Sequence, residues 1–262
     1  MGGLKTNVKN FNKYRFLLYE LVKKNIKLKY RRSYLGVLWT LIEPLLTMIV
    51  LTVVFGTFFG RGDKTYPVYI LTGRLLFSFF SSGTRSALKS ISGNASIIKK
   101  VYVPKYMYVL ANILSNFIIF LISLIVLVGV AVVLQVKPTG YAALCIVPLL
   151  ILFVLTSGVG LILATLDVFF RDIEYIWSVL SMLIMYASAI FYFPDRLMKT
   201  GKAWIFDLNP VYMCIKEFRD CVLYGQMMST QYIVVSSVSA VLIFFVGVVM
   251  FYKQQDKFIL YI

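Results

Sequence analysis

The sequence predicts an all-α, polytopic membrane protein. We expect six transmembrane helices, an N-terminal amphipathic interface helix, and re-entrant outer helices between spans five and six. Three observations predict this fold class: 60% of the 262 residues are hydrophobic, apolar runs long enough to cross a bilayer recur along the chain, and cations gather in alternate connections. We divide the chain into a cytoplasmic N-terminal segment (1–36) and one transmembrane domain (37–262).

The first predicted span, residues 37–59, follows a strongly basic stretch. It carries a single formal charge, Glu43, and at about 1.5 Å per residue it is long enough to cross a bilayer. Upstream, Leu18 and Leu21 share one helical face and Lys24 lies on another, which predicts a helix in the membrane interface. The basic collar marks this end of the span as cytoplasmic. Because that charge bias alone explains such a collar, a simple topology anchor is the alternative interpretation.

The second predicted span, residues 68–88, is interrupted by small and charged residues, namely Gly73, Arg74, Gly83 and Arg85. Such residues occur where a membrane helix packs against protein or faces an aqueous path. The sequence leaves both interpretations open.

The segment 89–106 is predicted to lie in the cytoplasm. It begins with polar residues, continues with a short apolar patch, and carries cations before Pro104. This pattern predicts a short helix outside the membrane that ends at the proline. An inert connector between two spans is the alternative.

The third and fourth predicted spans, 107–133 and 142–166, have no internal formal charge and are interpreted as scaffold. Beyond them, Asp172 and Glu174 would point to nearly opposite sides of a helix, which disfavours a shared metal ion. Asp172 is instead predicted to cap the fifth span, whose N-terminus favours an acid.

The fifth predicted span covers residues 175–193 and the sixth covers 232–252. Residues 194–231, between them, are too apolar for a solvated loop and too short and charged for two further spans. Re-entrant or interfacial helices on the outer face are therefore expected there. Six crossings place both termini in the cytoplasm, in agreement with the distribution of cations.

Composition also excludes several kinds of chemistry. The chain has no histidine, which removes imidazole acid–base catalysis and His-ligated metals, and it contains no phosphate-binding loop. We therefore expect no catalytic site, no metal site and no cofactor in this chain. The net charge of +16 is expected to reflect membrane orientation and contact with anionic lipids, rather than nucleic-acid binding.

Three loose motifs occur in order along the chain. Gly36, Trp39 and Pro44 follow the basic stretch. An Arg171–Asp172 pair follows the fourth span, and Asn209-Pro210 precedes Arg219 and Gly225. Together they resemble ABC-2 type permeases that export polysaccharide, O-antigen or teichoic acid. That resemblance covers nearly the whole chain.

The resemblance implies a homodimeric channel in the bacterial cytoplasmic membrane, joined to two copies of a separate ABC ATPase that binds ATP and Mg. It implies outward movement of an undecaprenyl-diphosphate-linked glycan. It also implies that the 89–106 segment contacts the ATPase. The residues expected in this coupling are Asn94, Ile97, Ile98, Lys99, Lys100, Val101, Arg171 and Asp172.

The chemistry of such a cargo suggests two further sets of residues. A diphosphate headgroup needs cations at the inner leaflet, and the candidates are Lys27, Lys29, Arg31 and Arg32. Sugars slide over flat amphipathic surfaces, and the candidate channel-lining aromatics are Phe55, Phe58, Phe59, Tyr186, Phe191 and Tyr192. A lipid-facing aromatic belt is the alternative interpretation of these rings.

Other functions are compatible with parts of this pattern. An ABC-2 permease for drugs or lipids would share the fold, and a passive channel would need no ATPase. A membrane-bound glycosyltransferase or acyltransferase would bind the same polyprenyl lipids, but the chain lacks histidine and any Asp-x-Asp pair for a metal-bound nucleotide sugar. Which glycan is carried does not follow from the sequence.

Overall fold

The computed structural model describes residues 3–31, 33–59, 63–100, 103–136, 139–199, 201 and 203–262, without the side chains of 3–13, 57–59 and 196. All regular secondary structure in this part of the chain is helical. The α-helices are α1 (Gly3–Lys29), α2 (Trp39–Phe59), α3 (Tyr66–Leu88), α4 (Ala95–Ile98), α5 (Tyr106–Val133), α6 (Ile146–Phe169), α7 (Ile173–Ala187), α8 (Asp195–Lys199), α9 (Trp204–Asp207), α10 (Pro210–Val222), α11 (Thr230–Gln254) and α12 (Phe258–Tyr261). The 3₁₀ helices are η1 (Gly36–Leu38), η2 (Ser92–Asn94), η3 (Gly140–Cys145) and η4 (Gln255–Lys257).

Four described segments are long and apolar enough to cross a membrane: Gly36–Gly56, Tyr106–Val133, Gly140–Phe169 and Thr230–Tyr261. They contain α2, α5, α6 and α11, which correspond to predicted spans one, three, four and six. Helix α3 has 23 residues but is interrupted by charged and hydroxyl side chains, and α7 has only 15 residues. Four of the predicted spans are therefore helices that are long and apolar enough to cross a membrane, whereas a count of six stays a prediction.

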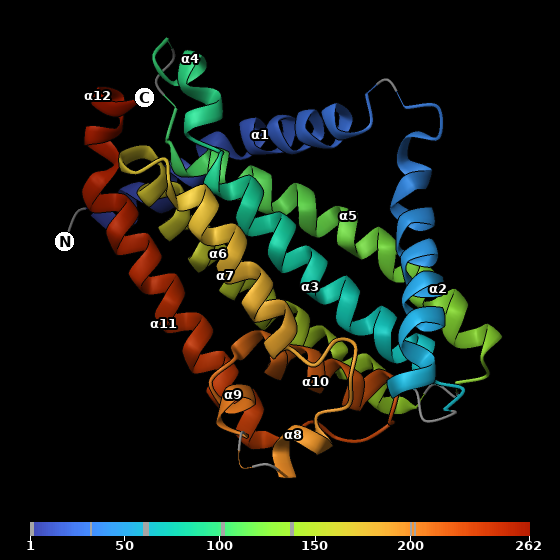
Figure 1. Cartoon of the computed structure of the whole chain (residues 1–262). Coiled ribbons are helices and arrows are strands. Elements are labelled where there is room, and N and C mark those ends of the chain that lie inside the picture. The colour runs from blue at the N-terminus through green and yellow to red at the C-terminus, as the bar shows by residue number, and fades with distance from the viewer. Residues whose placement is uncertain are drawn as a thin grey trace.

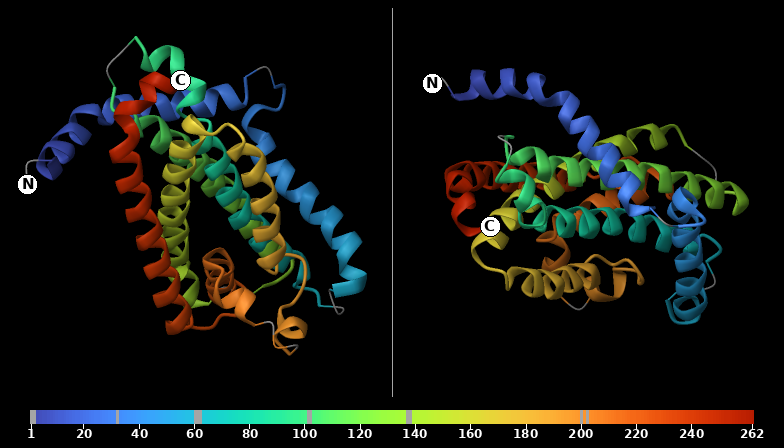
Figure 2. Two further views of the ribbon diagram at one scale, coloured as in Figure 1. Left: turned by 60° about the vertical axis from the view of Figure 1, so that its left-hand side comes forward. Right: turned by 90° about the horizontal axis from the view of Figure 1, so that it is seen from above.

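Helix α3 forms the centre of the bundle. It packs against α5 and α6, and most of its side chains are buried. Helices α6 and α11 form the most extensive pair, in which Gly158 of α6 and Gly247 of α11 allow the two backbones to approach closely. Helix α2 stands at one side of the bundle and α11 at the other (Figures 1 and 2). Among the long helices, α2 packs mainly against α3 and α5.

Helix α1 lies across one end of the bundle (Figure 1). Its Leu18 and Val22 are buried against Met107 and Ala111 of α5. The predicted amphipathic helix is thus present, but part of its apolar face is covered by α5 rather than by lipid. Leu28, farther along the same helix, remains 48% exposed.

The two ends of the bundle carry different elements. Helices α1, α4 and α12 gather at one end, and α8, α9 and α10 at the other (Figures 1 and 2). The fifth predicted span was expected to run to Phe193, but α7 ends at Ala187. The reason is tertiary, because the carbonyl groups of Ala189 and Ile190 accept hydrogen bonds from Arg219 of α10, and Ala189 adopts a positive φ of 46°.

Candidate functional site

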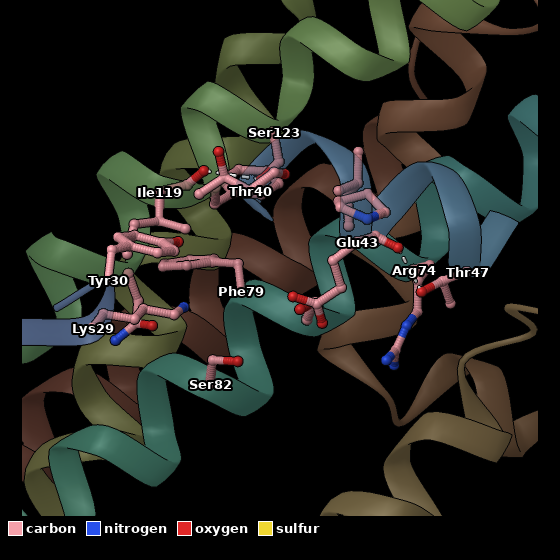
Figure 3. Close-up of a pocket in the computed structure, with 15 residues that line it drawn as sticks. Lys29, Tyr30, Thr40, Glu43, Thr47, Arg74, Phe79, Ser82, Ile119 and Ser123 are labelled. Atoms are coloured by element: carbon pink, nitrogen blue, oxygen red, sulfur yellow. Dashed lines mark hydrogen bonds between the residues drawn. The ribbon is translucent and has the colours of Figure 1, made fainter. Parts of the chain in front are cut away.

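A polar cavity lies where α1, α2, α3 and α5 meet (Figure 3). Helix α2 contributes Glu43, the charge that the sequence places inside the first span, and α1 contributes Lys29. The Ser123 hydroxyl of α5 donates to the Thr40 carbonyl of α2 over 3.2 Å, which joins two walls of the cavity. The polar residues of the lining are Lys29, Tyr30, Thr40, Glu43, Thr47, Arg74, Ser78, Ser82, Asn116 and Ser123.

Lys29 differs from the other predicted headgroup cations in its surroundings. Lys29 as a whole residue is exposed, but its ammonium lies among neighbouring side chains that partly desolvate it. This desolvation lowers the pKa of the ammonium, whereas the nearby Glu43 carboxylate raises it. Lys27 and Arg31 border a separate, largely apolar hollow between α1, η1 and α5. Arg32 lies outside the described residues. Among the described cations of this set, the structure therefore assigns only Lys29 to the polar cavity.

Four of the six candidate channel-lining aromatics have described side chains, and these make contacts in two pairs. The rings of Phe55 and Phe191 stack with centroids 5.4 Å apart, which joins α2 to the segment after α7. The Tyr192 hydroxyl donates to the Tyr186 carbonyl over 2.7 Å, and the Tyr186 side chain is 56% exposed. The side chains of the remaining two candidates, Phe58 and Phe59, lie outside the description.

A buried arginine organises the backbone beneath these rings. Arg219 of α10 is 3% exposed; its Nη1 donates to the Ala189 carbonyl over 3.0 Å and its Nη2 to the Tyr69 carbonyl over 2.9 Å. The guanidinium also lies 3.5 Å from the ring centroid of Tyr69. It thereby connects α10, α3 and the segment that follows α7.

Sequence reasoning missed the role of Tyr66 and Tyr69. The Tyr66 hydroxyl donates to the Phe191 carbonyl over 2.6 Å, and the Tyr69 hydroxyl donates to the carbonyls of Ala189 and Tyr192. Asn209, by contrast, could be recognised from the sequence, because an Asn before Pro is typical of a helix start. Its Oδ1 accepts from the backbone of α10, and its Nδ2 donates to the Ser188 hydroxyl over 3.0 Å.

The segment 89–106 forms η2 and α4 at the end of the bundle that carries α1 (Figure 1). The Ser92 hydroxyl donates to Asp167 of α6 over 2.8 Å, and Lys89 forms an ion pair of 2.6 Å with Glu174 of α7. These contacts connect the segment to α6 and α7.

The predicted coupling residues differ in exposure. Ile97 is 38% exposed, whereas Ile98 is 7% exposed and belongs to the main apolar core. Lys99 and Lys100 are exposed, and the Asn94 side chain donates to the Ser90 carbonyl over 2.8 Å. Val101 lies outside the described residues.

Arg171 and Asp172 form an exposed turn between α6 and α7. Asp172 occupies the N-cap position of α7, as predicted, but its side chain makes no capping hydrogen bond. Its backbone is already in the right-handed helical region, with φ −69° and ψ −14°, whereas a capping side chain normally needs an extended N-cap residue. Asp172 therefore occupies the predicted N-cap position, but the predicted capping hydrogen bond is absent.

Comparison with known proteins identifies the family. Residues 17–223 match the ABC-2 type transporter family, which covers more than half of the chain. The chain belongs to the ABC-2 type transporter family. An O-antigen export system permease protein RfbA from Klebsiella pneumoniae is 30% identical over 244 residues, which cover 92% of this chain and 93% of that protein.

Two further relatives of this ABC-2 chain are more distant. The polysialic acid transport protein KpsM from Escherichia coli is 21% identical over 90% of this chain and 92% of its own length. The capsule polysaccharide export inner-membrane protein CtrC from Neisseria meningitidis is 26% identical over 68% of each chain.

Proposed function

We propose that this ABC-2 chain is the membrane subunit of an ATP-driven exporter that moves a polysaccharide linked to undecaprenyl diphosphate out of the bacterial cytoplasm. The class of glycan is that of O-antigen, capsule or teichoic acid. One observation carries the proposal: similarity over 92% of the chain to a permease named for O-antigen export. The long apolar helices support a location in the cytoplasmic membrane.

In the proposed topology, α3 and α7 also cross the membrane, which gives six spans and cytoplasmic termini. The clustering of α1, α4 and α12 at one end supports this orientation, because that end also carries the exposed Lys99, Lys100 and Lys257. Residues 194–231 then form re-entrant or interfacial helices at the outer face. Their three short helices, α8 to α10, lie at the opposite end of the bundle.

Two copies of the chain would form the conduit. Helix α7 supports this because it contacts α3 and α6 along one side and leaves an apolar surface on the other. The exposed apolar residues of α7 are Tyr175, Ile176, Val179, Leu180, Met182, Leu183 and Tyr186. Helix α2 leaves a similar surface, which favours a pore bounded by α2 and α7 of two protomers.

Energy in this scheme comes from two copies of a separate ATPase that holds ATP and Mg. Closure of the ATPases would press on α4 and α1, and the contacts of Lys89 and Ser92 would pass this movement to α7 and α6. The chain itself acts by gating and carries no chemical step.

The test is co-purification with a candidate ABC ATPase from the same organism, followed by reconstitution in proteoliposomes. We expect ATP turnover to rise when an undecaprenyl-diphosphate-linked glycan is added, and the glycan to appear on the opposite side of the membrane. Stimulation by a drug or a lipid without sugar would instead favour an efflux permease. Failure to bind any ATPase would favour a passive channel.

Ile97 and Ile98 form a matched pair for testing the coupling segment. Ile97→Asp should reduce glycan-stimulated ATP turnover by about tenfold without lowering the thermal unfolding temperature, because the Ile97 side chain faces outward. Ile98→Asp should lower the unfolding temperature itself, because it places a charge in the core. ATPase assays and thermal unfolding in detergent separate the two effects. Full coupling in Ile97→Asp would argue against α4 as the contact.

The four candidate headgroup cations before the first span can be tested in a similar way. Replacing Lys27, Lys29, Arg31 and Arg32 together with Gln should weaken stimulation by a polyprenyl-diphosphate glycan at least about tenfold, because charge-assisted hydrogen bonds to phosphate are lost. Lys29→Gln alone should weaken this stimulation more than Lys27→Gln does, since Lys29 borders the polar cavity. Lys24→Gln, on the exposed side of α1, is the control. Unchanged stimulation in a correctly inserted fourfold variant would leave these cations as topology anchors.

A further inference from the structure

Helix α3 has two faces with different roles. On its buried side, Gly73 and Gly83 are close-packing positions: a Cβ at Gly73 would collide with the Arg219 guanidinium, and one at Gly83 would lie 2.8 Å from Thr156 Cγ2. The opposite side remains partly or fully exposed along a helix that is otherwise mostly buried. The residues of this polar face are Arg74, Ser78, Ser81, Ser82 and Arg85.

The two arginines of the polar face point in nearly the same direction. Positions 74 and 85 are about three helical turns apart, which separates them by about 16 Å along the axis and by about 20° around it. The three serines lie between them on the same side of the helix. The polar face is therefore a continuous strip with a cation at each end.

Cavities border this strip on both sides. Toward α2, Arg74, Ser78 and Ser82 line the polar cavity of Figure 3, in which Arg74 extends away from the backbone of α3. Toward α7, Arg74, Ser81 and Arg85 line a second cavity of about 200 Å³. Helix α7 adds Trp177, Ser178 and Ser181 to this second cavity. Arg74 thus borders both spaces.

Neither arginine is explained by contacts within the described part of the chain. The guanidinium groups of Arg74 and Arg85 have no hydrogen-bond or ionic partner there, and the ion pairs found there involve other residues. Arg219, by comparison, donates to several backbone carbonyls. A charged side chain on a membrane helix is costly unless it faces a partner, water or a ligand. Guanidinium groups bind phosphate oxygens through paired hydrogen bonds.

We propose that the polar face of α3 carries two successive phosphate-binding stations, Arg85 near the α4 end and Arg74 deeper in the bundle. The phosphate groups of the lipid-linked glycan occupy them in turn as the molecule passes between α2 and α7. This inference rests on the proposed export function. Two stations are inferred because the separation of about 16 Å along the helix exceeds the length of one diphosphate. The serines between them supply neutral donors, which do not hold an anion as tightly as a cation does.

Direct binding tests these stations without transport. The complete complex with its ATPase is placed in phosphatidylcholine nanodiscs, and affinity is measured for radiolabelled undecaprenyl diphosphate and for uncharged undecaprenol. Arg74→Gln and Arg85→Gln should each weaken diphosphate binding about tenfold or more, and the double variant should weaken it further. Undecaprenol binding should not change. Arg15→Gln, an exposed arginine on α1, should bind within about twofold of the unaltered protein.

Competition with inorganic pyrophosphate identifies the source of the anion. Competition would mean that the stations accept phosphate directly from water. Its absence would mean that the polyprenyl chain must deliver the phosphate. Either result supports phosphate binding that depends on the arginines.

Unaltered diphosphate affinity in variants with the normal unfolding temperature would overturn the two phosphate-binding stations. Arg85→Lys, which keeps the charge, is a second folded variant and should lose less affinity than Arg85→Gln.

The outcome separates this inference from the export function itself. If the double variant binds and exports glycan normally, the proposal of phosphate-binding stations is wrong and the proposed export function is retained. If no lipid-linked glycan is exported or stimulates ATP turnover, yet diphosphate binding still depends on both arginines, export is wrong and the stations stand.

Discussion

Arg219→Met should produce the largest loss of stability among single substitutions of polar residues in this chain. Methionine has a similar length and no donors, so the buried hydrogen bonds from the guanidinium to the carbonyls of Tyr69, Ala189 and Ile190 would be lost. The Tyr69 and Ala189 carbonyls keep hydroxyl donors, from Thr72 and Tyr69 respectively. Buried hydrogen bonds from a charged donor contribute about 1.5–3 kcal/mol each, and we expect a total loss of about 3–5 kcal/mol. Thermal unfolding of the purified protein in detergent measures the loss.

Two further variants show whether geometry or charge is responsible. Arg219→Lys should recover only part of the stability, because one ammonium cannot reproduce the fork of donors that reaches three carbonyls. Gly73→Ala should destabilise the protein by displacing the same guanidinium. Arg85→Gln, which removes an arginine without internal partners, is the control and should unfold at the normal temperature or above it. Equal unfolding temperatures for Arg219→Met and Arg85→Gln would contradict the proposed role of Arg219.

Gly158→Ala is expected to disrupt the contact between α6 and α11. A Cβ at Gly158 would lie 2.6 Å from Phe244 Cα, and one at Gly247 would lie 2.5 Å from the Gly158 carbonyl oxygen. Because these obstacles are backbone atoms, no side-chain rotation relieves them, and the two helices must separate. We expect a loss of about 3 kcal/mol, at the upper end of the usual cost of overpacking. Thermal unfolding again provides the measurement.

Gly129 of α5 is the matched control for this substitution. It is also a glycine inside a long apolar helix, but a Cβ there meets nothing within 4 Å. Gly129→Ala should therefore be neutral or stabilise the protein by about 0.5 kcal/mol through helix propensity. Similar unfolding temperatures for Gly158→Ala and Gly129→Ala would show that α6 and α11 do not need their close approach.

The second predicted span shows how far local sequence can be interpreted. Gly73 and Arg74 are neighbours in the sequence, and the sequence left packing and lining open for both. The structure separates them: Gly73 packs against Arg219, and Arg74 borders two cavities. Adjacent residues of a helix point about 100° apart, so their surroundings depend on which neighbours the bundle supplies.

The basic stretch before the first span gives a second example. An amphipathic pattern was enough to predict a helix before the first span, and α1 is present. The pattern did not indicate that Leu18 and Val22 would pack on α5, nor that Lys29 and Lys27 would border different cavities. Periodicity identifies an apolar face, whereas the segment that covers that face is supplied from elsewhere in the chain.

The sequence by itself determined the class of the protein, four apolar spans, the basic stretch before the first span, the short helix after α3 and the resemblance to ABC-2 permeases. These features depend on composition and on spacing within one segment, because transfer into a bilayer is a local property of about 20 residues. Only the tertiary structure decided where α7 ends, what Arg219 binds, and which side of α3 stays open. Those outcomes depend on hydrogen bonds and packing between residues as far apart as Tyr69 and Arg219, which no local pattern encodes.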